Sequence, residues 1–224
     1  MSRTLARWAD PDNVRGVTRG RFITFEGGEG AGKSTQVRRL VERLTGASVQ
    51  AVATREPGGS PGAEAIRSLL VTGEPDRWSP TAETLLLYAA RCDHIERTIR
   101  PALERGVWVI CDRFADSTRA YQGAAGGAPK DLITALEQTV VGAESPDLTL
   151  IFDLAPEAGL ARAERRGGGE ARFEAKGAAF HARLRAGFLA IAQAEPDRCV
   201  LIDAAPDADQ VAEAVWTVVS ERLL

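Results

Sequence analysis

Residues 22–35 of the chain read FITFEGGEGAGKST, a short apolar run that passes directly into a glycine-rich loop. The run at 22–26 has the composition of a buried strand. The loop at 27–34 matches the pattern GxxxxGK[ST], and a helix is expected to begin near Lys33. Strand, loop and helix in this order form a phosphate-binding loop, because its backbone N–H groups and the helix N-terminus face phosphate oxygens. We therefore predict a nucleoside triphosphate site here.

Two side chains of this loop are expected to act on the nucleotide directly. Lys33 would reach the β- and γ-phosphates, and the hydroxyl of Ser34 would ligate Mg²⁺. A glycine-rich turn without a ligand is the alternative, and the complete motif between a strand and a helix makes it the weaker one. The residues predicted to bind the nucleotide are Gly27, Gly28, Glu29, Gly30, Ala31, Gly32, Lys33, Ser34 and Thr35.

Beyond this loop, short apolar runs alternate with longer amphipathic stretches. The runs predict strands at 22–26, 49–53, 107–111, 148–153 and 199–202. The amphipathic stretches predict helices at 33–44, 62–70, 81–105, 130–142, 157–166, 173–194 and 208–223. Nearly all-apolar strands are typical of a parallel sheet that is covered on both faces. The chain is thus predicted to be α/β, with a five-stranded parallel sheet sandwiched by helices.

The chain shows neither an internal repeat nor a linker between domains. We expect one domain at 21–224, preceded by a mobile extension at 1–20 that lacks the apolar segment of a signal peptide. The glycine-rich stretches at 123–127 and 167–169 are predicted to be loops.

Composition argues against several classes of protein. The formal net charge of the 224 residues is −3, whereas proteins that bind nucleic acid are usually basic. No apolar run approaches the roughly 18 residues that span a bilayer. Cys92, Cys111 and Cys199 are too widely spaced to suggest a disulfide framework or a zinc site. We expect a cytoplasmic protein without a nucleic-acid or membrane partner.

Two other classes of protein use the same phosphate-binding loop. A GTPase switch would need an Asn/Thr-Lys-x-Asp segment, and none of Lys33, Lys130 and Lys176 stands in one. A motor or assembly ATPase usually carries partner-binding elaborations, for which a single compact domain leaves little room. A kinase of small molecules is the class that these observations favour.

Two polar segments follow predicted strands, at the sheet edge where ligands bind in open α/β folds. The segment TREPGG at 54–59 places Arg55 where it can hold an anion, although an ordinary surface turn is equally compatible. Asp112 and Arg113 end the third strand. Asp112 can act through Mg²⁺ and its waters, or orient an acceptor phosphate through Arg113; a buried structural ion pair is the alternative.

A third segment, at 162–174, combines several arginines with three successive glycines. A solvated helix face usually explains clustered charge, but acids are few here and the glycines suit a mobile lid. Lid arginines would neutralise charge on a transferring phosphoryl group. The arginines of this segment are Arg162, Arg165, Arg166 and Arg172. The two histidines, His94 and His181, are expected to be ordinary helix residues.

Taken in this order, the segments resemble bacterial thymidylate kinases over nearly the whole chain from Arg21 onward. The combination of the phosphate-binding loop with TREPGG at 54–59 and STRAYQG at 117–123 is highly specific, and YAAR, PDLTL and RFE continue it at 88–91, 146–150 and 172–174. The resemblance implies a P-loop kinase fold with a mobile lid. It also implies a homodimer that uses ATP and Mg²⁺ to convert dTMP to dTDP.

The resemblance further implies roles for individual residues. Glu29 is expected near the acceptor phosphate and 3′-hydroxyl, and Arg91 at a thymine carbonyl. Tyr121 would crowd the 2′ position of the sugar. The substrate-binding set that it implies is Glu29, Arg55, Leu87, Tyr88, Arg91, Asp112, Arg113, Ser117, Tyr121 and Gln122. The implied metal ligands are Ser34 and Asp112, and the implied catalytic residues are Lys33, Glu29, Arg113, Arg165, Arg166 and Arg172.

Three positions depart from the family pattern. Leu87 stands where the family usually has the aromatic residue that stacks on thymine, and Tyr88 is its immediate neighbour. Phe114 replaces a commoner Tyr or His, and Ala171 precedes Arg172 where Asp is common. The phosphate-binding loop lacks the arginine that some members carry there. The lid is therefore expected to supply the catalytic arginine, and which arginine does so stays open.

Overall fold

The computed structural model describes residues 18–74, 76–166 and 171–224. At its centre lies a sheet of five strands in the order β2-β3-β1-β4-β5, and every neighbouring pair is parallel. The predicted five-stranded parallel sheet is confirmed. The strands are β1 (Phe22–Gly27), β2 (Ala51–Arg55), β3 (Trp108–Asp112), β4 (Leu148–Asp153) and β5 (Cys199–Asp203).

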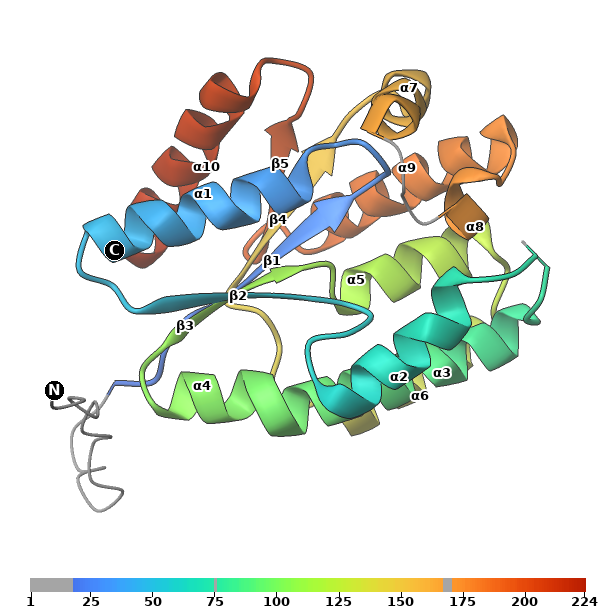
Figure 1. Ribbon diagram of the computed structural model, residues 1–224, viewed down its shortest axis with the longest axis horizontal. Helices are drawn as coiled ribbons and strands as arrows, with labels where there is room; N and C mark the ends of the chain where they lie inside the picture. Colours follow the sequence, from blue (N-terminus) through green and yellow to red (C-terminus); the bar gives the residue numbers. More distant parts are fainter. Residues whose placement is uncertain (1–17, 75, 167–170) are drawn as a thin grey trace, which may run out of the picture.

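Helices connect the strands and cover both faces of the sheet (Figure 1). In chain order they are α1 (Lys33–Gly46), α2 (Pro61–Val71), α3 (Pro80–His94), η1 (Ile95–Ile99), α4 (Arg100–Glu104), α5 (Ala115–Thr118), η2 (Arg119–Ala125), α6 (Lys130–Val140), α7 (Pro156–Arg166), α8 (Ala171–Glu174), α9 (Ala178–Ala194) and α10 (Ala208–Leu223). None of those within the described ranges is both long and apolar enough to cross a membrane.

The core lies on both sides of the sheet because successive strand residues point to opposite faces. Ile23 and Phe25 of β1 pack with α1 and α10 on one face. Phe22 of the same strand packs with Cys111 and with residues of α3, η1 and α4 on the other. A third cluster joins η2, α8 and α9. Because all strands run the same way, their carboxyl ends meet at one edge: Phe25 and Arg55 both lie level with Asp112.

Several predicted boundaries are wrong. The helix predicted at 81–105 is continuous but changes to a π-helical turn at Ile95–Ile99. Pro101 follows this turn and has no N–H to donate to the preceding turn, which is a usual cause of such a defect. The helix predicted at 173–194 is divided into α8 and α9, and Gly177 adopts an extended conformation just before α9.

Two further corrections concern the site edge. Strand β2 begins two residues later than predicted, so Arg55 is its last residue rather than part of the following loop. Helical residues at 115–125 were not predicted at all, and the glycine-rich stretch predicted as a loop at 123–127 begins inside η2. Of the predicted extension at 1–20, only 18–20 falls within the described residues; there Gly20 donates to the carbonyl of Leu103 over 2.8 Å.

Candidate active site

The loop between β1 and α1 has the backbone shape that phosphate binding needs. Gly27, Gly30 and Gly32 have φ values of 130°, 67° and 85°, which residues with a side chain rarely adopt. Close packing adds a second requirement at Gly30, where a Cβ would lie 1.9 Å from the carbonyl oxygen of Gly159 in α7. The loop therefore rests directly on the backbone of α7.

Lys33 lies inside this loop. Its ammonium donates to the carbonyl oxygens of Gly27 and Gly28 over 3.0 and 2.7 Å. Burial, followed by the neighbouring charge of Arg113, lowers the pKa of Lys33 to about 8. A phosphate bound in the loop would place further negative charge next to this buried ammonium and so favour its protonated form.

The two predicted metal ligands meet at the same edge. The Ser34 hydroxyl donates to a carboxylate oxygen of Asp112 over 2.5 Å, although the residues are far apart in sequence. Hydroxyl and carboxylate oxygens are donors that Mg²⁺ accepts, usually with waters and substrate phosphates completing its shell. Across the described ranges, no group of three or more His, Cys, Asp and Glu side chains could hold a metal by itself. A magnesium ion held by Ser34, Asp112 and nucleotide phosphates fits this donor set.

Glu29 joins the phosphate-binding loop to the neighbouring elements. One of its carboxylate oxygens accepts hydrogen bonds of 2.6 Å from both the Arg113 guanidinium and the Tyr121 hydroxyl. Burial alone would raise the pKa of Glu29, but Arg113 and then Lys33 outweigh it and hold the pKa below its usual value. Glu29 is therefore a buried carboxylate that stays ionised.

Arg113 occupies a constrained position just after β3. Its φ of 70° is unusual for a residue with a side chain and costs on the order of 1–3 kcal/mol. The guanidinium also donates to the carbonyl of Gly27 over 2.8 Å and to the Ser117 hydroxyl over 3.3 Å. The strained backbone thus places one arginine between the phosphate-binding loop and the start of α5.

A pocket opens beside Arg113, and it collects most of the predicted acceptor-binding residues. It is lined by Leu87, Arg91, Arg113, Ser117, Tyr121 and Gln122 from that set, together with Glu56, Pro57, Leu70, Phe114, Thr118 and Phe173. Five stretches of the chain, at 56–57, 70, 87–91, 113–122 and 173, therefore form one concave surface. It adjoins the phosphate-binding loop through the contact between Arg113 and Glu29.

Arg91 is held rigidly at this pocket. Its Nε donates to Glu56 over 2.8 Å, and one terminal nitrogen donates to the Phe114 carbonyl and to the Thr118 hydroxyl, each over 3.0 Å. The other terminal nitrogen is buried and has no hydrogen-bond partner among the described residues. Because an unpaired buried donor is costly, a carbonyl oxygen on a ligand would complete the arrangement.

Comparison with known proteins agrees with this geometry. A family model described as thymidylate kinase matches residues 25–215. The chain belongs to the thymidylate kinase family. The thymidylate kinase of Caulobacter vibrioides is 66% identical over 207 residues, which are 92% of this chain and 99% of the relative. That of Nitrobacter winogradskyi is 55% identical, with 92% and 90% covered.

Solved structures give the same result. The crystal structure of thymidylate kinase from Ehrlichia chaffeensis superposes with a TM-score of 0.72 at 35% sequence identity, and it covers 90% of this chain and 99% of that one. The predicted family, the P-loop kinase fold and the class of nucleoside monophosphate kinase are therefore confirmed.

Within this family framework, the structure separates Leu87 from Tyr88. Leu87 lines the acceptor pocket. Tyr88 is 1% exposed, belongs to the core beneath α3 and stacks its ring on the Arg91 guanidinium, 4.6 Å from its centre. Tyr88 is not among the residues that line this pocket, because adjacent helix residues point about 100° apart.

Arg55 lies outside the pocket. It is the last residue of β2, and its exposed guanidinium pairs with Glu64 of α2 at 3.3 Å. Glu64 also accepts from the N–H of Gly59, so it ties the TREPGG turn to the helix that follows. Arg55 thus lies at the expected sheet edge, and its guanidinium binds the Glu64 carboxylate there.

The predicted lid arginines lie in different surroundings. Arg162 donates to the carbonyls of Ala204 and Ala205 over 2.8 and 2.9 Å. Arg165 is exposed and donates to the carbonyl of Ala161 in its own helix. Arg172 is buried and pairs with Glu83 of α3. Residues 167–170 of the lid predicted at 162–174, and the side chain of Arg166, lie outside the described residues.

Three buried acids of the site were missed by sequence reasoning. Glu26 accepts from the N–H of Phe114 over 2.7 Å and from the Ser117 hydroxyl over 2.6 Å, and burial followed by Asp116 raises its pKa to about 8. Glu56 holds Arg91 and Glu83 holds Gln122. Glu26 ends an apolar strand and Glu56 stands within the TREPGG segment at 54–59, and these are the sequence signals that the three acids offer.

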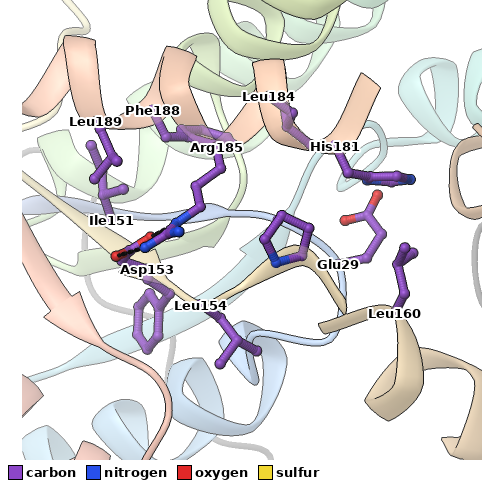
Figure 2. Close-up of a pocket in the computed structure, with 13 residues that line it drawn as sticks. Glu29, Ile151, Asp153, Leu154, Leu160, His181, Leu184, Arg185, Phe188 and Leu189 are labelled. Atoms are coloured by element: carbon purple, nitrogen blue, oxygen red, sulfur yellow. Dashed lines mark hydrogen bonds and ion pairs between the residues drawn. The ribbon is translucent and has the colours of Figure 1, made fainter. Parts of the chain in front are cut away.

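Another pocket, lined in part by Glu29, lies between β4, α7 and α9 (Figure 2). His181 of α9 points toward the Glu29 carboxylate there, and it is a further cause of the lowered pKa of that group. His181 was predicted to be an ordinary helix residue, and its buried Nε2 has no partner within the described part of the chain. Arg185 closes the far end through a two-pronged ion pair with Asp153 at 2.7 and 2.9 Å.

Proposed function

We propose that this chain carries out the reaction of its family, the transfer of the γ-phosphoryl group of ATP to dTMP, through the two sites described above. The observation that carries the proposal is the junction formed by Glu29, Arg113 and Tyr121. Glu29 belongs to the phosphate-binding loop, whereas Arg113 and Tyr121 line the acceptor pocket. A donor phosphate in the loop and an acceptor in the pocket would therefore meet at one point.

The donor side depends on Lys33 and the loop N–H groups. Lys33 would exchange its two carbonyl partners for the β- and γ-phosphate oxygens of ATP, because a charged acceptor binds an ammonium more strongly than a neutral carbonyl does. Ser34 and Asp112 would hold Mg²⁺, which would neutralise phosphate charge when bound. Phosphoryl transfer is mostly positioning and charge stabilisation, so these residues supply what the donor needs.

On the acceptor side, Arg113 would bind the dTMP phosphate. Its fork would align the acceptor oxygen with the γ-phosphate, and Glu29 fixes the orientation of that fork. Arg55 lies at the neighbouring strand end and would join the phosphate grip after releasing Glu64. Positioning by fixed groups lowers the barrier because the bound phosphate has little orientational freedom left to lose.

The base and sugar would be recognised deeper in the pocket. The unpaired terminal nitrogen of Arg91 would donate to a thymine carbonyl, with Ser117 and Gln122 along the base edge. Tyr121, held by Glu29, would stand against the 2′ position and disfavour ribose. Leu87 would supply apolar contact to the ring.

A coupled ADP-release assay with a panel of monophosphates tests this proposal. We expect dTMP to be phosphorylated faster than UMP or CMP, since only dTMP satisfies Arg91 without a 2′-hydroxyl against Tyr121. Equal rates with dTMP and UMP would contradict the assignment and favour another nucleoside monophosphate kinase. The assay also decides between dTMP and dUMP, which differ only by the methyl group that faces the apolar part of the pocket.

We further propose that the chain is a homodimer that acts in the cytoplasm on free nucleotides. Leu69 of α2 and Leu85 of α3 are 41% and 47% exposed on two helices that pack against each other. A dimer interface on these helices would cover both leucines. Light scattering should give twice the mass of the 23.9 kDa chain, and a monomer at assay concentration would contradict the dimer.

A further inference from the structure

Arg172 was expected to supply charge to the transferring phosphoryl group, yet the structure commits it elsewhere. Its guanidinium forms an ion pair with Glu83 of α3 and is only 2% exposed as a residue. It also donates to the carbonyls of Leu70 and Glu74 over 3.2 and 3.1 Å. Leu70 lies in the last turn of α2, where carbonyls lack helical partners and favour a cation. Arg172 therefore fastens α8 to two other helices.

Glu83 passes this contact on to the acceptor pocket. Its second carboxylate oxygen accepts a hydrogen bond of 2.7 Å from the side-chain amide of Gln122, and both groups are buried. Gln122 lines the acceptor pocket from η2. Arg172, Glu83 and Gln122 thus form a chain of polar contacts from α8 through α3 to the pocket wall.

The neighbour of Arg172 reaches the same pocket directly. Phe173 lines it and packs edge-on against Tyr121, with the ring centres 5.7 Å apart. Tyr121 in turn donates to Glu29 of the phosphate-binding loop. Because Arg172 fixes α8 in place, it also holds the neighbouring Phe173 in the pocket wall that faces the acceptor.

We propose that Arg172 is a positioning residue for the nucleoside of dTMP: by binding Glu83 and the end of α2, it fixes Gln122 and Phe173 in the pocket wall. This inference rests on the proposed acceptor pocket. It assigns to Arg172 a role in acceptor affinity and selectivity, and it leaves the transition-state charge to other cations. Glu83 binds both Arg172 of α8 and Gln122 of η2, and so holds together two segments of the pocket wall that are distant in sequence.

Arg172→Gln and Glu83→Gln, singly and together, test the proposal. Each single variant should raise the KM for dTMP about tenfold, which corresponds to about 1.4 kcal/mol. The KM for ATP and kcat should stay within about twofold, because ground and transition states lose the same contact. Glu83→Gln keeps an oxygen for Gln122 and removes only the charge that Arg172 needs, so the double variant should be no worse than either single one.

Binding without ATP separates positioning from catalysis. Calorimetry with dTMP alone should show the same loss of affinity as the KM, since the wall is formed before any phosphoryl transfer. Arg39→Gln is the matched control: Arg39 pairs with Asp209 on the exposed side of α1, so its loss should change neither KM. The proposal is overturned if Arg172→Gln lowers kcat by about a hundredfold or more with an unchanged dTMP affinity, or if Glu83→Gln does not reproduce its effect.

Breaking a buried ion pair can destabilise the fold, so a milder variant accompanies the others. Phe173→Leu keeps the Arg172–Glu83 pair and removes only the ring from the pocket wall. It should raise the KM for dTMP with kcat unchanged, and an unchanged KM would also refute the role of α8. The wild-type chain serves as the separate check on the proposed function: if it fails to phosphorylate dTMP at all, the acceptor assignment fails irrespective of Arg172.

Discussion

The substitution Leu87→Phe tests whether the side chain at position 87 contacts the nucleobase. Leu87 lines the acceptor pocket, as do Phe114 and Phe173, and the pocket has no aromatic ring from α3 among its described lining residues. A phenyl ring there would stack on thymine, and an aromatic pair contributes about 0.5–1.5 kcal/mol beyond its buried area. This corresponds to a dTMP affinity about two- to tenfold higher.

The gain should appear in KM and not in kcat. Stacking on the base is the same in the ground state and in the transition state, so it changes binding uniformly. Steady-state ADP release over a range of dTMP concentrations gives both constants, and calorimetry with dTMP alone gives the affinity. Thermal unfolding of the variant shows whether the larger ring is accommodated, because overpacking costs about 1–3 kcal/mol.

Tyr88→Phe is the matched control. Tyr88 is buried in the core, and its hydroxyl has no hydrogen-bond partner among the described residues. Loss of that hydroxyl should leave the dTMP affinity unchanged and leave stability equal or higher by up to about 1 kcal/mol. The reasoning is refuted if Leu87→Phe has no effect on dTMP affinity while Tyr88→Phe weakens it, since Tyr88 would then be the residue in contact with the base.

Three further outcomes test the donor side. Lys33→Ala should lower kcat by a factor on the order of 10²–10³ with little change in the melting temperature, because it removes the ammonium that would face the phosphates and leaves core packing intact. Normal turnover would contradict the assignment of the phosphate-binding loop. Since the protonated ammonium is the form that binds phosphate, and the pKa of Lys33 is lowered to about 8 in the ligand-free chain, kcat/KM for ATP should fall as pH rises through that value. A profile that stays flat across it would show that Lys33 is not the group that titrates. Ser34→Ala should raise the Mg²⁺ concentration needed for half-maximal rate about tenfold or more, and an unchanged requirement would remove Ser34 from the metal site.

Much of the fold could be predicted because its signals are local. The phosphate-binding loop is a contiguous motif, and the apolar runs of β1 and β4 mark central strands by themselves. The helical segment at 115–125 could not be predicted in the same way, since Gly123 and the glycines at 126–127 favour a loop. It is helical because Ala120 and Tyr121 pack into a cluster with α8 and α9. Tertiary packing there overrides the local preference.

The candidate site was predictable only in part, and for the same reason. Residues that belong to short motifs, such as Arg113 and Gln122, could be named from the sequence. Buried partners could not be assigned in this way. Glu83 is an ordinary helix acid, and Glu56 stands in the TREPGG segment, but neither shows its partner until the fold brings Gln122 and Arg91 to them. Ion pairs between residues distant in sequence produce no periodicity or spacing from which they could be predicted. The sequence therefore grouped Arg172 with the arginines of the lid segment, and its partner Glu83 on α3 became evident only from the structure.

The contact between the phosphate-binding loop and α7 has a consequence for how the chain tolerates change. In most helices, replacing glycine by alanine improves stability by up to about 1 kcal/mol. At Gly159 the added carbon would lie 2.4 Å from the carbonyl oxygen of Glu29, a backbone atom that has no flexible end to move aside. A mutational scan should therefore score Gly159 as sensitive as the loop glycines, even though it belongs to a different element. The donor site therefore restricts which amino acids are tolerated at positions that a bound nucleotide would not touch.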